Sequence, residues 1–531
     1  MRRAAAIVTV ISLSTACDLP MGDDAVESES SPAPSSSDPS TLEAGRSPAS
    51  AVMAETVPAG ARGGSRWADP LRVSQGPADV PLLAARPAAG TRDPESDELT
   101  TQPIDERSDV EGNEPPADSE ANWRAAWPGR VRAFHFVTFL YASGERDAPV
   151  LGYLRRGTRL VARPLHGALV EVPGGMGRLR EGLALEPVRL LGFVPPPADV
   201  REVVPYRYSR VLAPWTLVLD RPSASAEAFE ALRETVALEA SSPDAGVDAG
   251  AESPPEGVRD VLRKGFVIVE AARVSEGGAE WVRTLRGGWV PAGDLTAVTP
   301  PGARGVVLGG RWRLPLAFVV SGGARQWSWD ADAGRLVGPR PVARGQLFPV
   351  RSSTMVEQGG RRGYWTEAGT FLEARGVRIA ARRPRPEGVS PGARWVHVHL
   401  ATQTLVAYES DRPRFATVVS TGRAGFETPP GIYRIESKHV SITMDDRDSE
   451  EPFLLQEVPW TQFFRDGLAL HAAYWHDRFG YPRSHGCVNL APADARWLFR
   501  FTEPALPPGW HGRRVLPGEP SSFVWVEGGD T

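Results

Sequence analysis

Between residues 393 and 516 the chain consists of short runs in which apolar and polar residues alternate. Alternation with a period of two is typical of strands in a half-buried β-sheet. Residues 492–499 have helical character instead, and Pro492 suits the first turn of a helix. The predicted strands are residues 395–400 (WVHVHL), 403–408 (QTLVAY), 415–420 (FATVVS), 431–435 (GIYRI) and 467–476 (GLALHAAYWH). We therefore predict a mainly β domain with one short helix.

Upstream, residues 130–385 contain many short β-like runs separated by turn signals. A turn in which a basic residue precedes glycine recurs three times, at Gly157, Gly265 and Gly345. This pattern resembles bacterial SH3-like barrels, small five-stranded modules that are common on cell-wall enzymes. We predict two or three such modules; the alternative is an irregular β region that packs on the following domain. The tryptophans of the region are expected to fill small β cores rather than to stack on sugar: Trp281, Trp289, Trp327, Trp329 and Trp365.

The N-terminus has the order of an export signal. A short basic segment is followed by mostly apolar residues 4–13 and by small residues ahead of Cys17. Residues 1–17 therefore resemble a bacterial lipoprotein signal, whose cysteine is acylated after cleavage. A plain secretory signal and an uncleaved anchor are the alternatives, because Leu13 lies four residues before Cys17 and such signals usually have leucine at three.

Residues 18–120 consist mainly of Ser, Pro, Ala, Asp, Glu and Gly. They contain too few large apolar residues to offset the entropy of ordering, so we predict a disordered linker. A flexible chain of about 100 residues has an r.m.s. span of roughly 50–60 Å and can act as a tether. A second low-complexity run, 240–256, is expected to be an insertion in a loop.

Composition excludes several classes of protein. A net charge of −5 and a pI near 6.1 argue against a nucleic-acid-binding protein. Two cysteines in 531 residues exclude a disulfide scaffold and a multi-cysteine metal site. His397 and His399 have no third ligand at a recognised spacing, so we predict no metal site and no cofactor. After residue 17 no stretch reaches the roughly 20 apolar residues of a membrane span.

The second cysteine lies in a segment suited to catalysis. Cys487 follows Ser484, His485 and Gly486, and it lies 16 residues after His471. One strand, a turn and a return can bring His471 and Cys487 to one site. A nucleophilic cysteine needs a base or a positive neighbour, and histidine titrates close to neutral pH. These residues match thiol acyl transfer.

Three stretches together resemble an L,D-transpeptidase catalytic domain of the YkuD type. They are the strand pair with Gln403, the segment STGRAGFETPPGIYRI at 420–435, and His471 with SHGCVNL at 484–490. The resemblance covers residues 393–516 and implies a β-rich sandwich in which the cysteine lies on a loop under a lid. Residues 517–531 are left as a C-terminal tail.

The resemblance also implies roles for individual residues. Cys487 is the nucleophile and His471 the base, while Ser484, His485 and Gly486 shape the site and the oxyanion pocket. Two positions depart from the commonest pattern: Ala472 stands where many members have Gly or Ser, and Asn489 where many have Arg. Charge for the substrate carboxylate is then expected from Arg483 or Arg423. The predicted substrate contacts are Asn489, Arg483, Tyr474 and Thr428.

The implied reaction begins when His471 takes the thiol proton and Cys487 attacks the third residue of a peptidoglycan tetrapeptide stem. D-Alanine leaves, and the thioester passes to an amine of another stem or of a wall-attached protein, or to water. The resemblance leaves the acceptor open and implies a periplasmic or cell-envelope protein, tethered to a membrane by lipid on Cys17. A non-catalytic wall-binding lipoprotein is the alternative. A serine penicillin-binding protein is excluded because neither lysine, Lys264 or Lys438, completes Ser-x-x-Lys.

Overall fold

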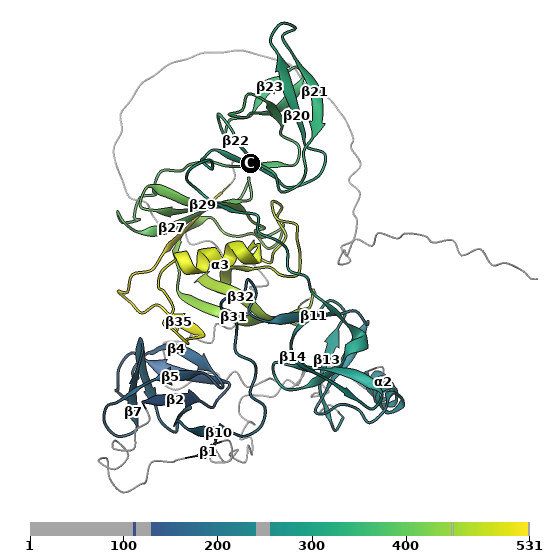
Figure 1. Cartoon of the computed structure of the whole chain (residues 1–531), viewed down its shortest axis with the longest axis vertical. Helices are drawn as coiled ribbons and strands as arrows, with labels where there is room; N and C mark the ends of the chain where they lie inside the picture. The colour runs from purple at the N-terminus through teal and green to yellow at the C-terminus, as the bar shows by residue number, and fades with distance from the viewer. Residues whose placement is uncertain (1–109, 113–128, 241–254, 448, 450, 529–531) are drawn as a thin grey trace, which may run out of the picture. The chain divides into compact units, whose positions relative to one another are not determined.

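The computed structural model describes residues 110–112, 129–240, 255–447, 449 and 451–528 (Figure 1). They all belong to one of the two units into which the chain divides, Ser65–Thr531. The predicted signal 1–17 with Cys17 lies outside the described residues. Of the predicted linker only β1 (Val110–Gly112) is described, and it pairs antiparallel with β10 (Val188–Leu190). Within the described residues, no helix is long and apolar enough to cross a membrane.

The C-terminal domain contains a six-stranded sheet built largely from the alternating runs of the sequence. Its strand order is β18–β29–β28–β27–β36–β30. The central strands β27 and β28 are among the most buried of the chain because apolar residues occupy both of their faces. The bounds are β18 Val306–Val307, β27 Arg394–His399, β28 Thr404–Glu409, β29 Arg412–Val418, β30 Gly431–Arg434 and β36 Phe523–Glu527.

A second set of strands faces the first across a shared core. β31 pairs with β35 and β32, β32 with β33, and β33 runs parallel to β34. The helix α3 (Pro492–Phe501) follows β34, and its buried residues join side chains of both sheets in one cluster that includes Val396, Leu470 and Leu498. The bounds are β31 Ser437–Asp446, β32 Phe453–Arg465, β33 Leu468–Ala472, β34 Val488–Leu490 and β35 Gly512–Arg514. The predicted β-sandwich is confirmed.

The structure differs from the sequence prediction at two strand ends. The predicted tail 517–531 contains β36, which pairs parallel with β27 and antiparallel with β30. Val524 and Val526 of this strand are buried in the core. The predicted strand 467–476 ends at Ala472. Ala473 still donates its N–H to the Leu490 carbonyl of β34, and residues 473–476 lie outside the strand.

The accessory region contains three β units that share one pairing pattern. In each, the first strand pairs antiparallel with the strand after a glycine turn and with a strand at the end of the unit, which is the last strand in the second and third units and the last but one in the first: β2 with β5 and β9, β11 with β14 and β17, β19 with β22 and β26. The turn glycines Gly157, Gly265 and Gly345 have φ of 89°, 89° and 88°. Each donates its N–H to the last residue of the first strand: Ala133, Val211 or Val319. The repeated sequence turn is therefore a repeated structural turn, whereas the likeness to SH3-like barrels stays a prediction.

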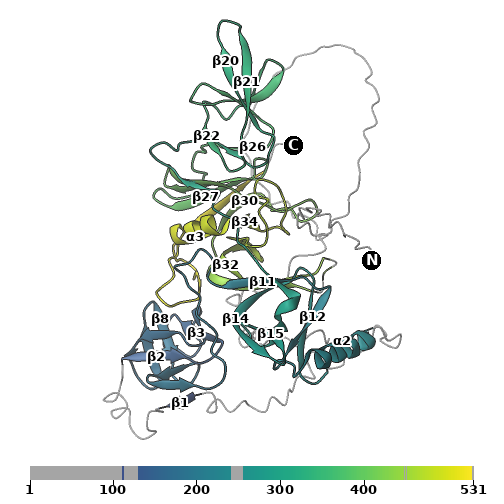
Figure 2. The same cartoon turned by 45° about the vertical axis from the view of Figure 1, so that its right-hand side comes forward.

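Each unit has its own apolar cluster. The first unit comprises β2 Arg130–Ala133, β3 Val137–Tyr141, β4 Val150–Arg155, β5 Arg159–Val161, β6 Arg163–Pro164, β7 Leu169–Val172, β8 Gly175–Arg178, β9 Leu183–Leu185 and β10. The second comprises β11 Arg207–Val211, β12 Trp215–Leu219, α2 Ala226–Ala240, β13 Val258–Arg263, β14 Val267–Glu276, β15 Ala279–Thr284, β16 Trp289–Pro291, a 3₁₀ turn at Ala292–Asp294 and β17 Leu295–Ala297. The third comprises β19 Leu316–Val319, β20 Arg325–Asp330, β21 Arg335–Pro341, β22 Leu347–Pro349, β23 Val356–Gln358, β24 Arg361–Trp365, β25 Phe371–Glu373 and β26 Val377–Ala380. The helix α2 was missed because its residues follow a polar loop inside an otherwise β-like region (Figure 2).

Candidate active site

The strands β33 and β34 bring the predicted nucleophile and base together. They run parallel, and His471 lies directly opposite Asn489. Cys487 immediately precedes β34, two residues before Asn489, so alternation places both side chains on the face that His471 also occupies. The thiol of Cys487 lies 3.8 Å from the carbonyl oxygen of Gly467, at the start of the His471 strand. His471 and Cys487 are 16 residues apart in the sequence, and the parallel pairing of β33 with β34 places them on the same face of the sheet.

Side-chain hydrogen bonds hold the loop that precedes Cys487. Ser484 Oγ accepts the N–H of Gly486 at 3.2 Å and donates to the carbonyl of Cys487. Thr428 Oγ1 donates to the Gly486 carbonyl at 2.8 Å and accepts the N–H of Gly422 at 2.9 Å. Gly486 has a φ of +107°, a conformation that an L side chain rarely adopts, and a Cβ there would meet Leu468 at 2.8 Å. The positive φ is the reason that glycine is needed here, because the end of the Leu468 side chain could move away from a Cβ.

The glycine loop at 421–428 lies against this loop. Arg423 N–H donates to the Ser484 carbonyl at 3.0 Å, and Ser484 N–H donates to the Thr421 carbonyl at 3.0 Å. Gln403, between β27 and β28, donates to Thr421 Oγ1 at 2.6 Å and accepts the N–H of Thr421 at 2.9 Å. The three stretches that carried the sequence resemblance are thus joined by direct hydrogen bonds and strand pairing.

The electrostatics of the pair are those of two neutral groups. Cys487 is 4% exposed and His471 is 2% exposed. Burial raises the pKa of the Cys487 thiol to about 11, although a backbone hydrogen bond at Ala469 opposes the shift. Burial also lowers the pKa of His471 to about 4. His471 Nδ1 lies 3.3 Å from the Ala472 carbonyl, a contact that favours the tautomer with hydrogen on Nδ1 and leaves Nε2 as the acceptor.

We expect alkylation of Cys487 by iodoacetamide to be slow at pH 7 and to rise about tenfold per pH unit up to pH 9. A thiol pKa raised to about 11 leaves about a hundredfold less thiolate at pH 7 than an ordinary cysteine has. The measurement is adduct formation by mass spectrometry in the full chain with Cys17→Ser, in which Cys487 is the remaining cysteine. A rate that is already maximal at pH 7 would instead indicate a resting thiolate–imidazolium pair.

His485 occupies a second cluster, beside the loop. Its Nε2 lies 3.1 Å from Arg423 Nη2 and 3.5 Å from Glu451 Oε2. Its ring packs against Phe426 and Phe453, with centroids 4.4 and 5.4 Å away. Burial and Arg423 lower the pKa of His485. His485 thus tethers the SHGC loop to the glycine loop and to the turn between β31 and β32.

That turn is also bonded to the second accessory unit. Arg447 Nη1 donates to both carboxylate oxygens of Asp260 on β13, at 2.6 and 2.8 Å. Arg447 Nε lies 3.0 Å from Asp445 on β31. The turn between β31 and β32 is therefore tied to the accessory region on one side and to Arg423 and His485 through Glu451 on the other.

His476 is a site residue that the sequence analysis did not single out. Its Nε2 lies 3.0 Å from Asn489 Nδ2. Burial and the charge of Arg483 lower the pKa of His476 to about 3, so a neutral ring accepts the amide N–H of Asn489. Trp475 stacks on His471 with centroids 5.8 Å apart. The only sequence signal for this group was a pair of histidines five residues apart.

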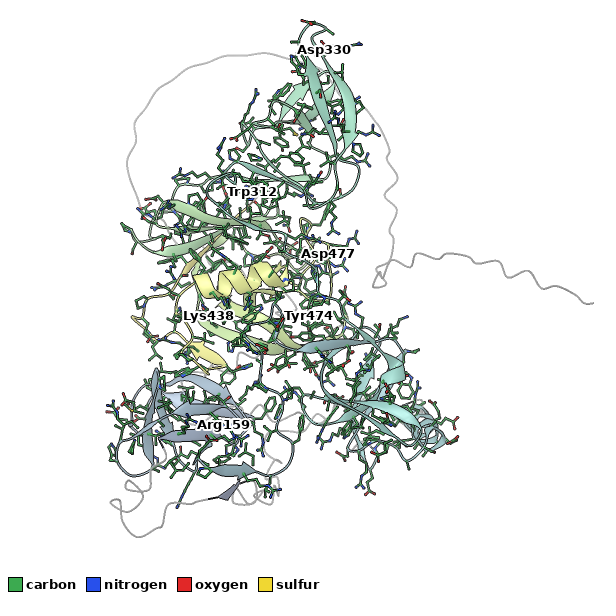
Figure 3. The ribbon with its side chains drawn as sticks, viewed as in Figure 1. Arg159, Trp312, Asp330, Lys438, Tyr474 and Asp477 are labelled. Carbon is green, nitrogen blue, oxygen red and sulfur yellow. The ribbon has the colours of Figure 1, made fainter. Side chains whose placement is uncertain are left out.

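Two of the predicted substrate contacts have other partners in the structure. Tyr474 is buried, donates its hydroxyl to the Gln456 carbonyl at 2.8 Å and stacks on Tyr208 of β11 at 3.9 Å (Figure 3). Thr428 is buried and uses its hydroxyl in the loop contacts described above. Arg483 donates its backbone N–H to the Thr421 carbonyl at 2.8 Å. The predicted roles of these side chains toward substrate stay predictions.

No cluster of three metal-ligating side chains occurs within the described parts of the chain. Of the two histidines weighed as metal ligands, His397 is buried with its Nε2 2.7 Å from Glu527 on β36. His399 Nδ1 accepts the N–H of Thr402 at 3.1 Å. Both side chains are thus engaged in contacts that stabilise the six-stranded sheet.

Comparison with known proteins places the C-terminal domain in a class. Residues 393–516 match the family model YkuD, the L,D-transpeptidase catalytic domain. L,D-transpeptidase 1 of Mycobacterium tuberculosis is 33% identical over 88 residues, which are 15% of this chain and 35% of that protein. A probable L,D-transpeptidase 3 of the same organism is 30% identical over 92 residues, 16% of this chain and 34% of that protein. The chain spans about a third of the length of these curated relatives.

Among solved structures, an L,D-transpeptidase from Stackebrandtia nassauensis is 29% identical, with a TM-score of 0.20 over 26% of this chain and 57% of that one. An L,D-transpeptidase from Mycobacterium smegmatis is 18% identical, with a TM-score of 0.22 over 44% of this chain and 100% of that one. The family match and the sandwich together identify residues 393–516 as a YkuD-type domain.

Proposed function

We propose that this protein is a cysteine-dependent L,D-transpeptidase that acts on peptidoglycan stem peptides. The observation that carries the proposal is the parallel pairing of the His471 strand with the strand that follows Cys487, within a domain that matches the YkuD family. Both side chains share one face of the sheet, beside a loop whose glycine needs a positive φ. Thiol acyl transfer needs a cysteine and a base within reach of each other, and the shared face supports this assignment of Cys487 and His471.

In the proposed reaction His471 accepts the Cys487 proton as the sulfur attacks the carbonyl carbon of the third stem residue. The tetrahedral intermediate collapses, its bond to D-alanine breaks, and the protonated His471 returns the proton to the leaving amine. The result is a thioester on Cys487. An amine of a second stem then attacks the thioester, His471 takes the amine proton and returns it to the sulfur, and a 3→3 cross-link forms.

In the resting protein the Cys487 thiol and the His471 imidazole are both neutral, because burial disfavours both charged forms. Transfer of the proton from Cys487 to His471 during the attack is therefore more favourable than formation of an ion pair before substrate binds.

An amine of a wall-attached protein is a second candidate acceptor, and water would give carboxypeptidase activity. The proposed setting is the cell envelope, with the chain tethered by lipid on Cys17.

The test is incubation of the full chain, carrying Cys17→Ser, with purified disaccharide-tetrapeptides. We expect mass spectrometry to detect cross-linked dimers that lack one D-alanine and a covalent adduct on the Cys487 peptide. Tripeptide without dimer would assign a carboxypeptidase, or a transferase whose acceptor is a protein. A folded protein that gives neither product nor thioester adduct would contradict the proposal and favour a wall-binding lipoprotein.

A further inference from the structure

The second and third accessory units contain corresponding sheets, but a helix covers the outer face of this sheet in the second unit only, among the described residues. In the second unit, Leu219 on β12 pairs with Trp289 on β16, and in the third, Trp327 on β20 pairs with Phe371 on β25. The two pairs occupy corresponding positions in their units. In each unit one partner lies on the second strand (β12 or β20) and the other on the last strand but one (β16 or β25). The two faces can therefore be compared directly.

In the second unit the helix α2 covers this face. It is inserted between β12 and β13, and Phe229, Leu232 and Val236 pack with the cluster that contains Trp281. Phe229 meets the Trp281 ring edge-on at 5.5 Å, and Trp281 is only 1% exposed. The spacing of these three apolar residues is that of one helix face.

In the third unit the corresponding connection, between β20 and β21, is a short turn at 331–334 (Figures 1 and 3, where Asp330 marks the end of β20). The face keeps its aromatic side chains: Trp329 contacts Trp365 at 5.8 Å, and Trp365 contacts Phe371 at 5.4 Å. Trp329 is 38% exposed, and Met355 and Val356 are exposed as well. No helix among the described residues takes the place of α2 on this face.

The rim of this aromatic face is basic. Arg361 lies over the Trp327 ring at 4.0 Å and pairs with Glu373 at 3.0 Å, and Arg351 lies 5.9 Å from the Trp365 centroid. The third unit and its flanks, residues 311–385, carry 14 arginines and five acidic residues, a net charge of +9 in a chain whose net charge is −5. The exposed arginines of residues 311–385 are Arg311, Arg313, Arg325, Arg335, Arg340, Arg344, Arg351, Arg361, Arg362, Arg375 and Arg382. An excess of arginine around the exposed indole of Trp329 attracts an acidic partner with an apolar face.

We propose that the outer face of the third unit, where Trp329 and Trp365 are accessible beside the buried Trp327 and Phe371, is a docking site for an acidic amphipathic helix of a partner protein. The second unit supplies the geometric template, because the same face there accepts a helix through apolar residues spaced along one side. The basic rim supplies the preference for an acidic partner. The inference is independent of the proposed catalytic activity.

The test uses residues 222–240 of this chain as a synthetic peptide, because they contain α2, which has four glutamates and one arginine. We expect a fluorescent form of the peptide to bind the full chain saturably, and to bind less tightly as salt is raised. Trp329→Ala should weaken binding about tenfold or more. A peptide with its glutamates changed to glutamine should bind several times more weakly.

Arg351→Glu gives a second variant that leaves the apolar cluster intact, and it should weaken binding about fivefold. Arg263→Glu on β13 is the matched control, an exposed arginine of the second unit, and should leave binding unchanged. Binding that is absent, or equal for Arg351→Glu and Arg263→Glu, would overturn the proposal. So would selective binding of purified peptidoglycan strands, with loss on Trp329→Ala, when the peptide does not bind.

Discussion

Replacing Cys487 with alanine is expected to reduce product formation from tetrapeptide stems by at least about 10³-fold. The proposed reaction passes through a covalent bond to this sulfur, and alanine has no group that can form it. His471→Gln should also lower the rate, by about 10²- to 10⁴-fold, because it removes the proton acceptor and leaves the nucleophile. The measurement is the initial rate of D-alanine release and of dimer formation.

The matched control is Cys17→Ser, which removes the other cysteine of the chain and should leave the rate unchanged. Cys487→Ala removes one buried sulfur, so its fold is checked by thermal unfolding beside the parent. A folded Cys487→Ala protein that keeps a tenth or more of the rate would show that Cys487 is not the nucleophile.

Replacing Glu457 with glutamine is expected to lower the free energy of unfolding by about 3–5 kcal/mol. Glu457 on β32 is 2% exposed, and both of its carboxylate oxygens bind Arg155 Nη2 of the first accessory unit, at 2.9 and 3.0 Å. Ser441 donates to the same carboxylate at 2.6 Å. Glutamine would leave the Arg155 guanidinium buried without its counter-charge.

The electrostatics of Glu457 support the size of this effect. Burial alone would raise the pKa of Glu457, but Arg155 and the hydrogen bonds from His511 and Ser441 hold it well below its ordinary value. The carboxylate therefore stays charged across the physiological range. Because the pKa in the folded state is depressed, the stability it contributes is present above the pKa of the unfolded state and is lost as pH falls.

The measurement is urea unfolding followed by tryptophan fluorescence, with Glu171→Gln as control. Glu171 pairs with Arg163 in the first unit, and the two side chains are 39% and 75% exposed. An exposed pair of this kind contributes up to about 1 kcal/mol. Equal effects of the two substitutions would show that the Arg155–Glu457 pair does not hold the first unit to the C-terminal domain.

Much of the C-terminal sandwich could be predicted from local pattern. The alternating runs at 395–400, 403–408 and 415–420 correspond to β27, β28 and β29, and the predicted helix corresponds to α3. In the structure both faces of β27 and β28 are buried, so the period of two separates two apolar clusters, one with Val396 and one with Trp395, and not core from solvent. The strand β36 was missed because its place in the sheet depends on partners about 90 or more residues away, which no local pattern encodes.

Part of the candidate site could likewise be predicted from the sequence, and part depends on the fold. Sequence spacing placed His471 and Cys487 within reach of each other, and the SHGC motif indicated a tight loop. Three contacts of the site involve residues that only folding brings together. They are the contact of His476 with Asn489, the stacking of Trp475 on His471 and the bonds from the β31–β32 turn to Asp260. The burial of Tyr474, whose hydroxyl donates to the Gln456 carbonyl, is likewise a result of folding, and its predicted contact with substrate stays a prediction.

What the sequence by itself determined is the local chemistry: which residues can act as nucleophile and base, which glycines permit tight turns, and where strands alternate. These properties depend on residue type and short-range sterics, so they are present in any stretch of the chain taken alone. Only the tertiary structure decided the burial of Cys487 and His471, the Arg155–Glu457 pair and the uncovered face of the third unit. Burial, pKa and exposure are set by which distant segments pack together, and that packing is a property of the whole fold.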